Sequence, residues 1–467
     1  MATYNVFNLF VHVGGLNQVV NNSYEFHEAM LIVSDDIIRL DVKFSDRDKI
    51  SNQMGTWNNE INVESWGKFV VCENNKAYNN NSNESVYIDF SNSKLLTYKS
   101  SIDSPYISFF IDYIKYSYDY PTNKNEAIFW LNDAGYKFIQ DYYNVEWGIE
   151  LPKRIKIEAH NILGTKCEPY FDFHRSNGGN SREIIIQKTP KIKWYNFSDV
   201  ESVVKYNRWI CQLASLFYSN NINYKGGRID FNNTRTIIYQ ILPASTYKSK
   251  NTFLYFKGLQ HIYQFLNSIS YELYQKFEID FGIITERFVQ SSCLNASTQY
   301  LVLYNILELC KKIDISTIKG DTDCNKARIK ENQCIKKEIS RIKDELKLFF
   351  KNKLDKIKNE EMRKLIEARC NAASTKLDTA PSSFIMEKYI AEQGFKMDAI
   401  NKHVQKDMPG YNFFQLRSPI IHGSSINAVT TVNDILSHIG KILTLKLLGC
   451  PIQVSEILAY SDIYKKQ

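Results

Sequence analysis

Arg417 and His422, in the segment FQLRSPIIHG at residues 414–423, are the pair of residues best suited to chemistry. Cleavage of RNA without a metal ion needs a group of near-neutral pKa to move protons, and free imidazole titrates at about 6.5. It also needs a fixed cation, and the planar guanidinium of arginine binds phosphate through two hydrogen bonds without losing its charge. The segment therefore predicts a candidate site for metal-free phosphodiester chemistry.

The spacing of the two residues constrains the backbone between them. On an ideal helix, five positions turn a side chain by about 140°, so a straight helix would not present both residues on one face. Pro419 cannot continue a regular helix, and Ser418 as N-cap with Pro419 at the first position would start a new one. The same residues are equally compatible with a structural role, in which Arg417 pairs with an acid and His422 packs.

The charge of the chain is concentrated in one segment. The 467 residues carry a formal net charge of +7, and residues 311–370 alone hold 18 Lys/Arg against 11 Asp/Glu. The rest of the chain is therefore nearly neutral. Attraction to phosphates and a solvated helical face both account for such a segment.

Several common kinds of site are missing from the sequence. It has no phosphate-binding P-loop, no nucleophile elbow and no H-E-x-x-H motif. Its nine cysteines include no C-x-x-C pair, and His160, Cys167 and His174 match no familiar metal-site spacing. We therefore expect reduced thiols, no metal and no other cofactor. Because neither a signal peptide nor an apolar stretch of about 18 residues is apparent, we expect a cytoplasmic protein without membrane contact.

The first part of the chain is typical of β-structure. Short segments rich in Val, Ile, Tyr and Phe alternate with polar loops, and these segments are residues 7–13, 30–34, 37–44, 68–72, 85–90, 154–158 and 183–187. They predict an antiparallel β-sandwich or a rolled sheet. An accessory helix is expected near residues 124–143, and Gly226 and Gly227 are expected to form a turn.

Helical periodicity dominates after residue 198. Asp199 is expected to cap a helix over residues 203–217, and a strand is expected at 236–242. Further helices are predicted at residues 259–277, 298–312, 333–369 and 432–448. The second of these carries an apolar stripe formed by Tyr300, Leu303, Tyr304, Leu307 and Cys310, and the third resembles a short coiled-coil seam.

The arginine–histidine segment resembles the R-x4–6-H signature of HEPN domains. Ser418 is the polar residue after the arginine, Gly423 follows the histidine, and the helix predicted at 432–448 comes next. Upstream, residues 300–308 look like the apolar helix, ending in the acidic Glu308, that opens the domain in the Apea-like branch. The similarity covers roughly residues 255–460, and the β-rich first half is similar in layout to Apea-type anti-phage proteins.

This resemblance implies an α+β fold in three parts. A β-rich, sandwich-like domain would span residues 1–195 and would be followed by a connecting helix and strand region at 196–254. An all-α HEPN helical bundle would occupy residues 255–467, with a charged helical insertion at about 313–375.

The resemblance also implies a function and roles for four residues. It implies a metal-independent endoribonuclease that assembles as a homodimer, with both signature segments facing one cleft. Arg417 would bind the scissile phosphate, His422 would act as general base or acid, Ser418 would support the phosphate, and Glu308 would hold Arg417 or His422 in place. Similar proteins act in abortive defence against phage, so residues 1 to about 250 would sense a phage-derived trigger or position RNA.

Two other interpretations stay open. One is a catalytically silent HEPN-like scaffold that binds RNA or a protein partner, which would dimerise and bind RNA without cutting it. The other is an unrelated β-sandwich binding protein with a helical oligomerisation region. In that case Arg417 and His422 would point into separate cores.

Overall fold

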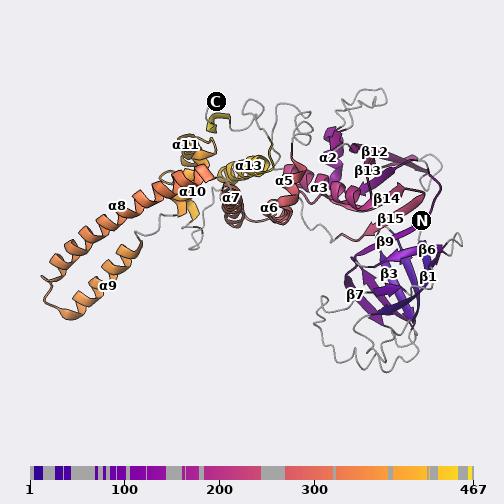
Figure 1. Ribbon diagram of the computed structural model, residues 1–467, viewed down its shortest axis with the longest axis horizontal. Helices are drawn as coiled ribbons and strands as arrows, with labels where there is room; N and C mark the ends of the chain where they lie inside the picture. Colours follow the sequence, from indigo (N-terminus) through magenta and orange to yellow (C-terminus); the bar gives the residue numbers. More distant parts are fainter. Residues whose placement is uncertain are drawn as a thin grey trace. The chain divides into compact units, whose positions relative to one another are not determined.

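The computed structural model describes most of the chain in two compact units, one formed by residues up to 242 and one by residues from 269 onward. The described residues are 5–13, 27–34, 36–43, 69–71, 77–79, 85–90, 92–100, 106–122, 124–142, 160–162, 165–177, 184–242, 269–318, 322–376, 382–417, 420, 430–450 and 461–464. The first unit is rich in strands and the second is helical (Figure 1), which confirms the predicted α+β layout.

All strand pairs described in the first unit are antiparallel. The strands are β1 (Asn5–Val13), β2 (His27–Val33), β3 (Ile38–Lys43), β4 (Phe69–Val71), β5 (Ala77–Asn79), β6 (Ser85–Asp89), β7 (Leu95–Ser100), β8 (Tyr106–Ile111), β9 (Tyr113–Asp119), β10 (Glu126–Leu131), β11 (His160–Ile162), β12 (Thr165–Asn177), β13 (Ile184–Tyr195), β14 (Tyr224–Phe231) and β15 (Thr234–Gln240). Each predicted strand overlaps one of these strands, apart from residues 154–158, which lie outside the described part. The sequence analysis did not predict β5, β7, β8, β9, β10, β11, β12 or β14.

The strands form two sheets that share β6. Their hydrogen-bonded order is β11-β12-β13-β10-β14-β15-β9-β6-β5-β1-β2-β3-β8-β7, and β4 pairs with β1. Alternate residues of β2, β3 and β8 face one apolar core, which includes Leu31, Leu40 and Phe109. Tyr116 on β9 and Ile237 on β15 belong to the same core, so both sheets contribute to it.

The predicted helix near residues 124–143 is largely wrong. Its first part is β10, which lies between β13 and β14, and only α2 (Gly135–Tyr142) is helical. Ala127, Phe129 and Leu131 are buried while the residues between them are half-buried. This period of two is the alternation of a strand with one face on the core.

The turn predicted at Gly226 and Gly227 is also wrong, because both residues lie inside β14. A Cβ atom on Gly226 would lie 2.4 Å from the Trp130 ring, and one on Gly227 would lie 2.5 Å from the Phe129 ring. The two aromatic side chains of β10 therefore require glycine on the neighbouring strand.

Helix α3 (Val200–Tyr218) packs on β14, and Asp199 caps it as predicted. The Asp199 carboxylate accepts the Ser202 N–H at 2.7 Å, and hydrogen bonds from Ser202 lower the Asp199 pKa below its usual value. The Trp194 indole N–H donates to the buried Asn207 side chain at 3.1 Å, which ties β13 to the helix.

The second unit is built from helices. They are α5 (Tyr271–Lys276), α6 (Glu278–Ser291), α7 (Ala296–Ile318), α8 (Thr322–Leu354), α9 (Glu360–Lys376), α10 (Ser382–Glu392), α11 (Met397–Asp407) and α13 (Thr430–Leu447), with short 3-10 helices η2 (Phe413–Leu416) and η4 (Ser461–Ile463). Helix α7 packs against both α6 and α13. The predicted apolar stripe of α7 is confirmed, since all five of its side chains are at most 1% exposed. Helix α13 ends before Gly449, whose φ is 77°.

The helix predicted over residues 333–369 is in fact two helices. Helix α8 ends at Leu354 and α9 begins at Glu360, after Asn359 accepts the Met362 N–H at 3.1 Å. The predicted apolar seam is only partly buried. Leu346 is half-buried, whereas Phe349 is 54% exposed. Within the ranges given above, no helix is long and apolar enough to cross a membrane.

Candidate functional site

Arg417 directly follows η2, and the sequence around it explains why it is held in place. Asn412 and Gln415 form a reciprocal capping box at the start of η2. Phe413 and Leu416 are fully buried, so the short helix is anchored by apolar packing. Arg417, with φ −58° and ψ −45°, extends from this anchored segment.

Helix α7 also contacts η2 through two tyrosine side chains. The Tyr300 hydroxyl donates to the Phe413 carbonyl oxygen at 3.1 Å, and the Phe414 ring lies edge-on to Tyr304 at 5.9 Å. Burial raises the pKa of Tyr300 well above its ordinary value, and the nearby Arg417 only partly opposes this rise. Tyr300 is therefore a neutral hydrogen-bond donor and not an acid or base at physiological pH.

The Arg417 side chain lies against two residues of α7. Its guanidinium carbon is 4.8 Å from the centre of the Tyr304 ring, and its Nη1 atom is 3.5 Å from Oε1 of Glu308. The side chains of Arg417 and Glu308 are 33% and 38% exposed. A guanidinium over an aromatic face and beside a carboxylate is restrained in orientation while part of it stays open to solvent.

The structure thus brings together two of the four predicted site residues. Arg417 and Glu308 come from segments more than a hundred positions apart and form an ion pair. Ser418 and His422 lie outside the described residues, so their roles stay predictions. Ile420, which lies between them in the sequence, is buried.

Tyr304 is a site residue that the sequence analysis missed. It was assigned only to the apolar stripe of α7, yet its ring also supports the Arg417 guanidinium. The signal was its spacing of four residues from Glu308, because residues four apart lie on the same face of a helix. An aromatic residue at that position can therefore contact the same cation as the carboxylate.

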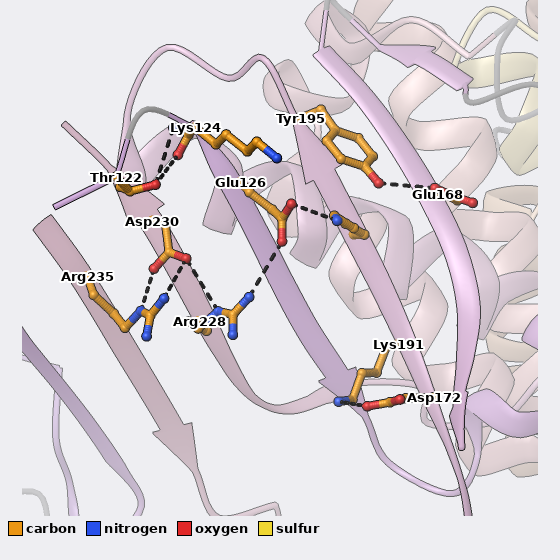
Figure 2. Close-up of polar contacts among 11 residues, drawn as sticks. Thr122, Lys124, Glu126, Glu168, Asp172, Lys191, Tyr195, Arg228, Asp230 and Arg235 are labelled. Carbon is orange, nitrogen blue, oxygen red and sulfur yellow. Dashed lines mark hydrogen bonds and ion pairs between the residues drawn. The ribbon is translucent and has the colours of Figure 1, made fainter. Parts of the chain in front are cut away.

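A second cluster of charged residues lies on one face of the β-sheet in the first unit (Figure 2). Glu126 accepts from Lys193 at 2.6 Å and lies 3.5 Å from Arg228. Asp230 is 3.5 Å from Arg228 and 2.6 Å from Arg235. Three cations and two carboxylates alternate along this row, which joins β13, β10, β14 and β15. The row is suited to holding the strands in register.

Metal binding finds no support among the residues that the structure describes. They contain no group of three or more His, Cys, Asp or Glu side chains placed to hold a metal ion. Cys167 is buried, and burial raises its thiol pKa to about 12, so the thiolate that a metal requires is disfavoured.

Comparison of the chain with protein-family models, with curated proteins and with solved structures finds no match.

Proposed function

We propose that this protein is a metal-independent endoribonuclease of the HEPN type. The observation that carries the proposal is the placement of Arg417, a partly exposed cation that Glu308 and the Tyr304 ring hold at the surface of α7. Metal-free phosphodiester cleavage requires a fixed cation and a group that transfers protons, and in this proposal Arg417 is the cation and His422 is the proton-transfer group.

In the proposed reaction, the two ends of the segment at residues 417–422 have different roles. The 2′-hydroxyl of RNA attacks the adjacent phosphorus and loses its proton to a base, the bond to the 5′-oxygen breaks, and an acid protonates that oxygen. His422 serves as base or acid, Arg417 stabilises the charge on the phosphorane, and Ser418 supports the phosphate. Glu308 and Tyr304 orient Arg417 and are positioning residues.

The wider context of this activity is part of the same proposal. The resemblance to Apea-like HEPN proteins supports a homodimer in which two signature segments face one cleft. It also supports a cytoplasmic toxin of abortive defence, with the β-rich part of the chain sensing a phage-derived trigger. These proposals rest on family analogy alone.

A catalytically silent scaffold is the second candidate. The contacts of Arg417 favour this scaffold, because an ion pair and a cation–ring contact also stabilise a helical bundle that has no catalytic activity. On this reading, Arg417 would hold the fold or the dimer together, and the protein would bind RNA without cleaving it.

Purified full-length protein incubated with labelled RNA in the presence of a chelator tests the proposal. We expect Arg417→Ala and His422→Ala each to lower cleavage by about a hundredfold or more while leaving the circular dichroism spectrum unchanged. His403→Ala is the matched control, because the His403 ring pairs with Asp462 of η4 at 2.7 Å and has no role in the proposed chemistry. Equal cleavage by the parent and both variants would rule out the proposed chemistry.

A further inference from the structure

Four lysines of α8 lie along one side of the helix. Lys336, Lys343, Lys347 and Lys351 follow one another at steps of seven, four and four residues. At 3.6 residues per turn these positions fall within a sector of about 80°, and they extend over about 22 Å of helix. We refer to these four residues as the lysine stripe.

Two glutamates on the other side of α8 pair with an arginine of the same helix. Glu338 and Glu345 lie on nearly the opposite side from the lysine stripe, as their positions on the helix require. Arg341 pairs with both of them, at 2.6 Å and 3.2 Å. These two carboxylates are therefore turned away from the lysine stripe, and Asp344, about 20° outside its sector, is the acidic residue of α8 that lies beside it.

The lysine stripe is accessible to a ligand. Lys336, Lys347 and Lys351 are exposed, and Lys343 is half-buried. Among the described elements, α9 is the main packing partner of α8, and the half-buried side chains of Leu346 and Phe350 mark the packed side. For Lys336, Lys347 and Lys351 no ion pair is formed within the described part of the chain.

The surrounding charge reinforces the stripe. Residues 322–376, which contain both α8 and α9, hold 16 Lys/Arg against 9 Asp/Glu, a surplus of +7 that equals the formal net charge of the whole chain. A long-range field of this sign draws polyanions toward the hairpin formed by the two helices.

We propose that the lysine stripe of α8 binds the phosphate backbone of RNA. This inference rests on the proposed function, since it assigns to the hairpin the capture of the RNA that the Arg417 segment cleaves. Each lysine contacts a phosphate as a point charge and displaces condensed counterions, so the stripe contributes affinity without reading sequence.

An RNA backbone fits this surface better than a protein partner does. Lysine is depleted from the cores of protein–protein interfaces, where aromatic side chains and arginine prevail. The stripe contains no large apolar side chain between its lysines, and Ser340 is the residue that lies among them on the same side of the helix. A row of hydrated ammonium groups suits a chain of phosphates.

The test is the salt dependence of binding of a labelled single-stranded RNA to full-length protein. One variant replaces the four stripe lysines by glutamine (Lys336→Gln, Lys343→Gln, Lys347→Gln and Lys351→Gln). The control makes the same number of charge-neutralising changes at other exposed lysines of the hairpin (Lys353→Gln, Lys356→Gln, Lys358→Gln and Lys364→Gln). Circular dichroism verifies that both retain the helical content of the parent.

We expect the stripe variant to bind RNA roughly tenfold or more weakly at moderate salt. We also expect the slope of log K against log salt to fall by roughly 3, because four phosphate contacts are lost. The control variant should change both quantities much less. Equal effects in the two variants would overturn the assignment to the stripe, and so would binding of RNA by the stripe variant at the parent's affinity and salt slope.

Cleavage measured on the same proteins separates this inference from the proposed function. If the parent binds RNA through the stripe but never cuts it, the proposed catalysis fails and the assignment of the binding surface stands. If the parent cuts RNA and the stripe variant binds and cuts as well as the parent, the binding surface is wrong and the catalytic proposal stands. Binding of an acidic polypeptide with equal affinity and equal dependence on the stripe would also contradict specificity for nucleic acid.

Discussion

The Nη1 atom of Arg417 lies 3.5 Å from Oε1 of Glu308, and this ion pair joins η2 to α7. Both side chains are about one-third exposed, so solvent screens the pair and its contribution to stability is small, within about 1 kcal/mol. This contact restrains the Arg417 guanidinium and leaves part of it open to solvent. Because its contribution to stability is small, we infer that it orients Arg417.

Glu308→Gln tests that orientation. The variant keeps the shape of the side chain but removes its charge, so we expect cleavage to fall by about tenfold to a hundredfold, through misplacement of Arg417. The midpoint of thermal unfolding should change little, and RNA affinity should not fall. A variant that cleaves as fast as the parent would show that Arg417 does not need this partner.

Tyr304 is predicted to act through its ring and not through its hydroxyl. Tyr304→Phe retains an aromatic face under the guanidinium and should keep most of the cleavage rate. Tyr304→Leu removes that face from a side chain that is 1% exposed, so it should slow cleavage and destabilise the protein by about 2–4 kcal/mol. If Tyr304→Phe cleaved RNA as slowly as Tyr304→Leu, the contact of the ring with Arg417 would not explain the effect of Tyr304 on cleavage.

Gly226→Ala should destabilise the first unit. The new Cβ would lie 2.4 Å from the Trp130 ring and 2.7 Å from the Ile238 carbonyl oxygen, and such overpacking costs about 1–3 kcal/mol. Urea unfolding of Gly226→Ala, Trp130→Ala and the double variant measures the coupling. We expect Gly226→Ala to lower the free energy of unfolding by less in the Trp130→Ala background than in the parent. Full additivity of the two changes in unfolding free energy would contradict the contact between residue 226 and Trp130.

The buried Lys441 on α13 predicts a dependence of stability on pH. Burial lowers the pKa of Lys441 from 10.5 to about 7. Between these values the unfolded chain binds a proton that the folded chain does not, so stability is lost as pH falls from 10.5 toward 7. The slope from this one group is at most about 1.4 kcal/mol per pH unit.

Lys441→Met should remove that slope and raise the free energy of unfolding at neutral pH. The check is denaturant unfolding at several values between pH 7 and the onset of tyrosine ionisation, with the exposed Lys402→Met as control. Parallel pH profiles for the parent and Lys441→Met would contradict a neutral amine in the folded state.

The elements that sequence analysis predicted correctly are those whose pattern is local. The stripe of α7 repeats at helical spacing from Tyr300 to Cys310, and all five of its side chains are buried. Asp199 caps α3 because a cap depends only on the few residues that follow it. Glu308 was assigned from family resemblance, and its contact with Arg417 joins two segments that no local pattern connects.

Two of the errors, at Gly226 and Tyr304, concern contacts between residues that are distant in sequence. Gly226 reads as a turn residue because nothing near it in the sequence reveals that Trp130 covers it from a neighbouring strand. The six residues of β10 alternate too briefly to stand out beside the helix that follows at Gly135. The contact of Tyr304 with Arg417 was missed because the two residues lie more than a hundred positions apart in the sequence.

We propose that the Arg417 segment cleaves RNA through the 2′-hydroxyl without a metal. In the most direct measurement, an RNA is incubated with the full-length protein in the presence of a chelator. The same RNA with a single 2′-deoxy substitution at the cleaved position is incubated in parallel, and the cleavage products are compared. We expect fragments that end in a 2′,3′-cyclic phosphate and no cleavage at the substituted position. Cleavage of the 2′-deoxy RNA, fragments that end in a 3′-hydroxyl, or an intact RNA would contradict it.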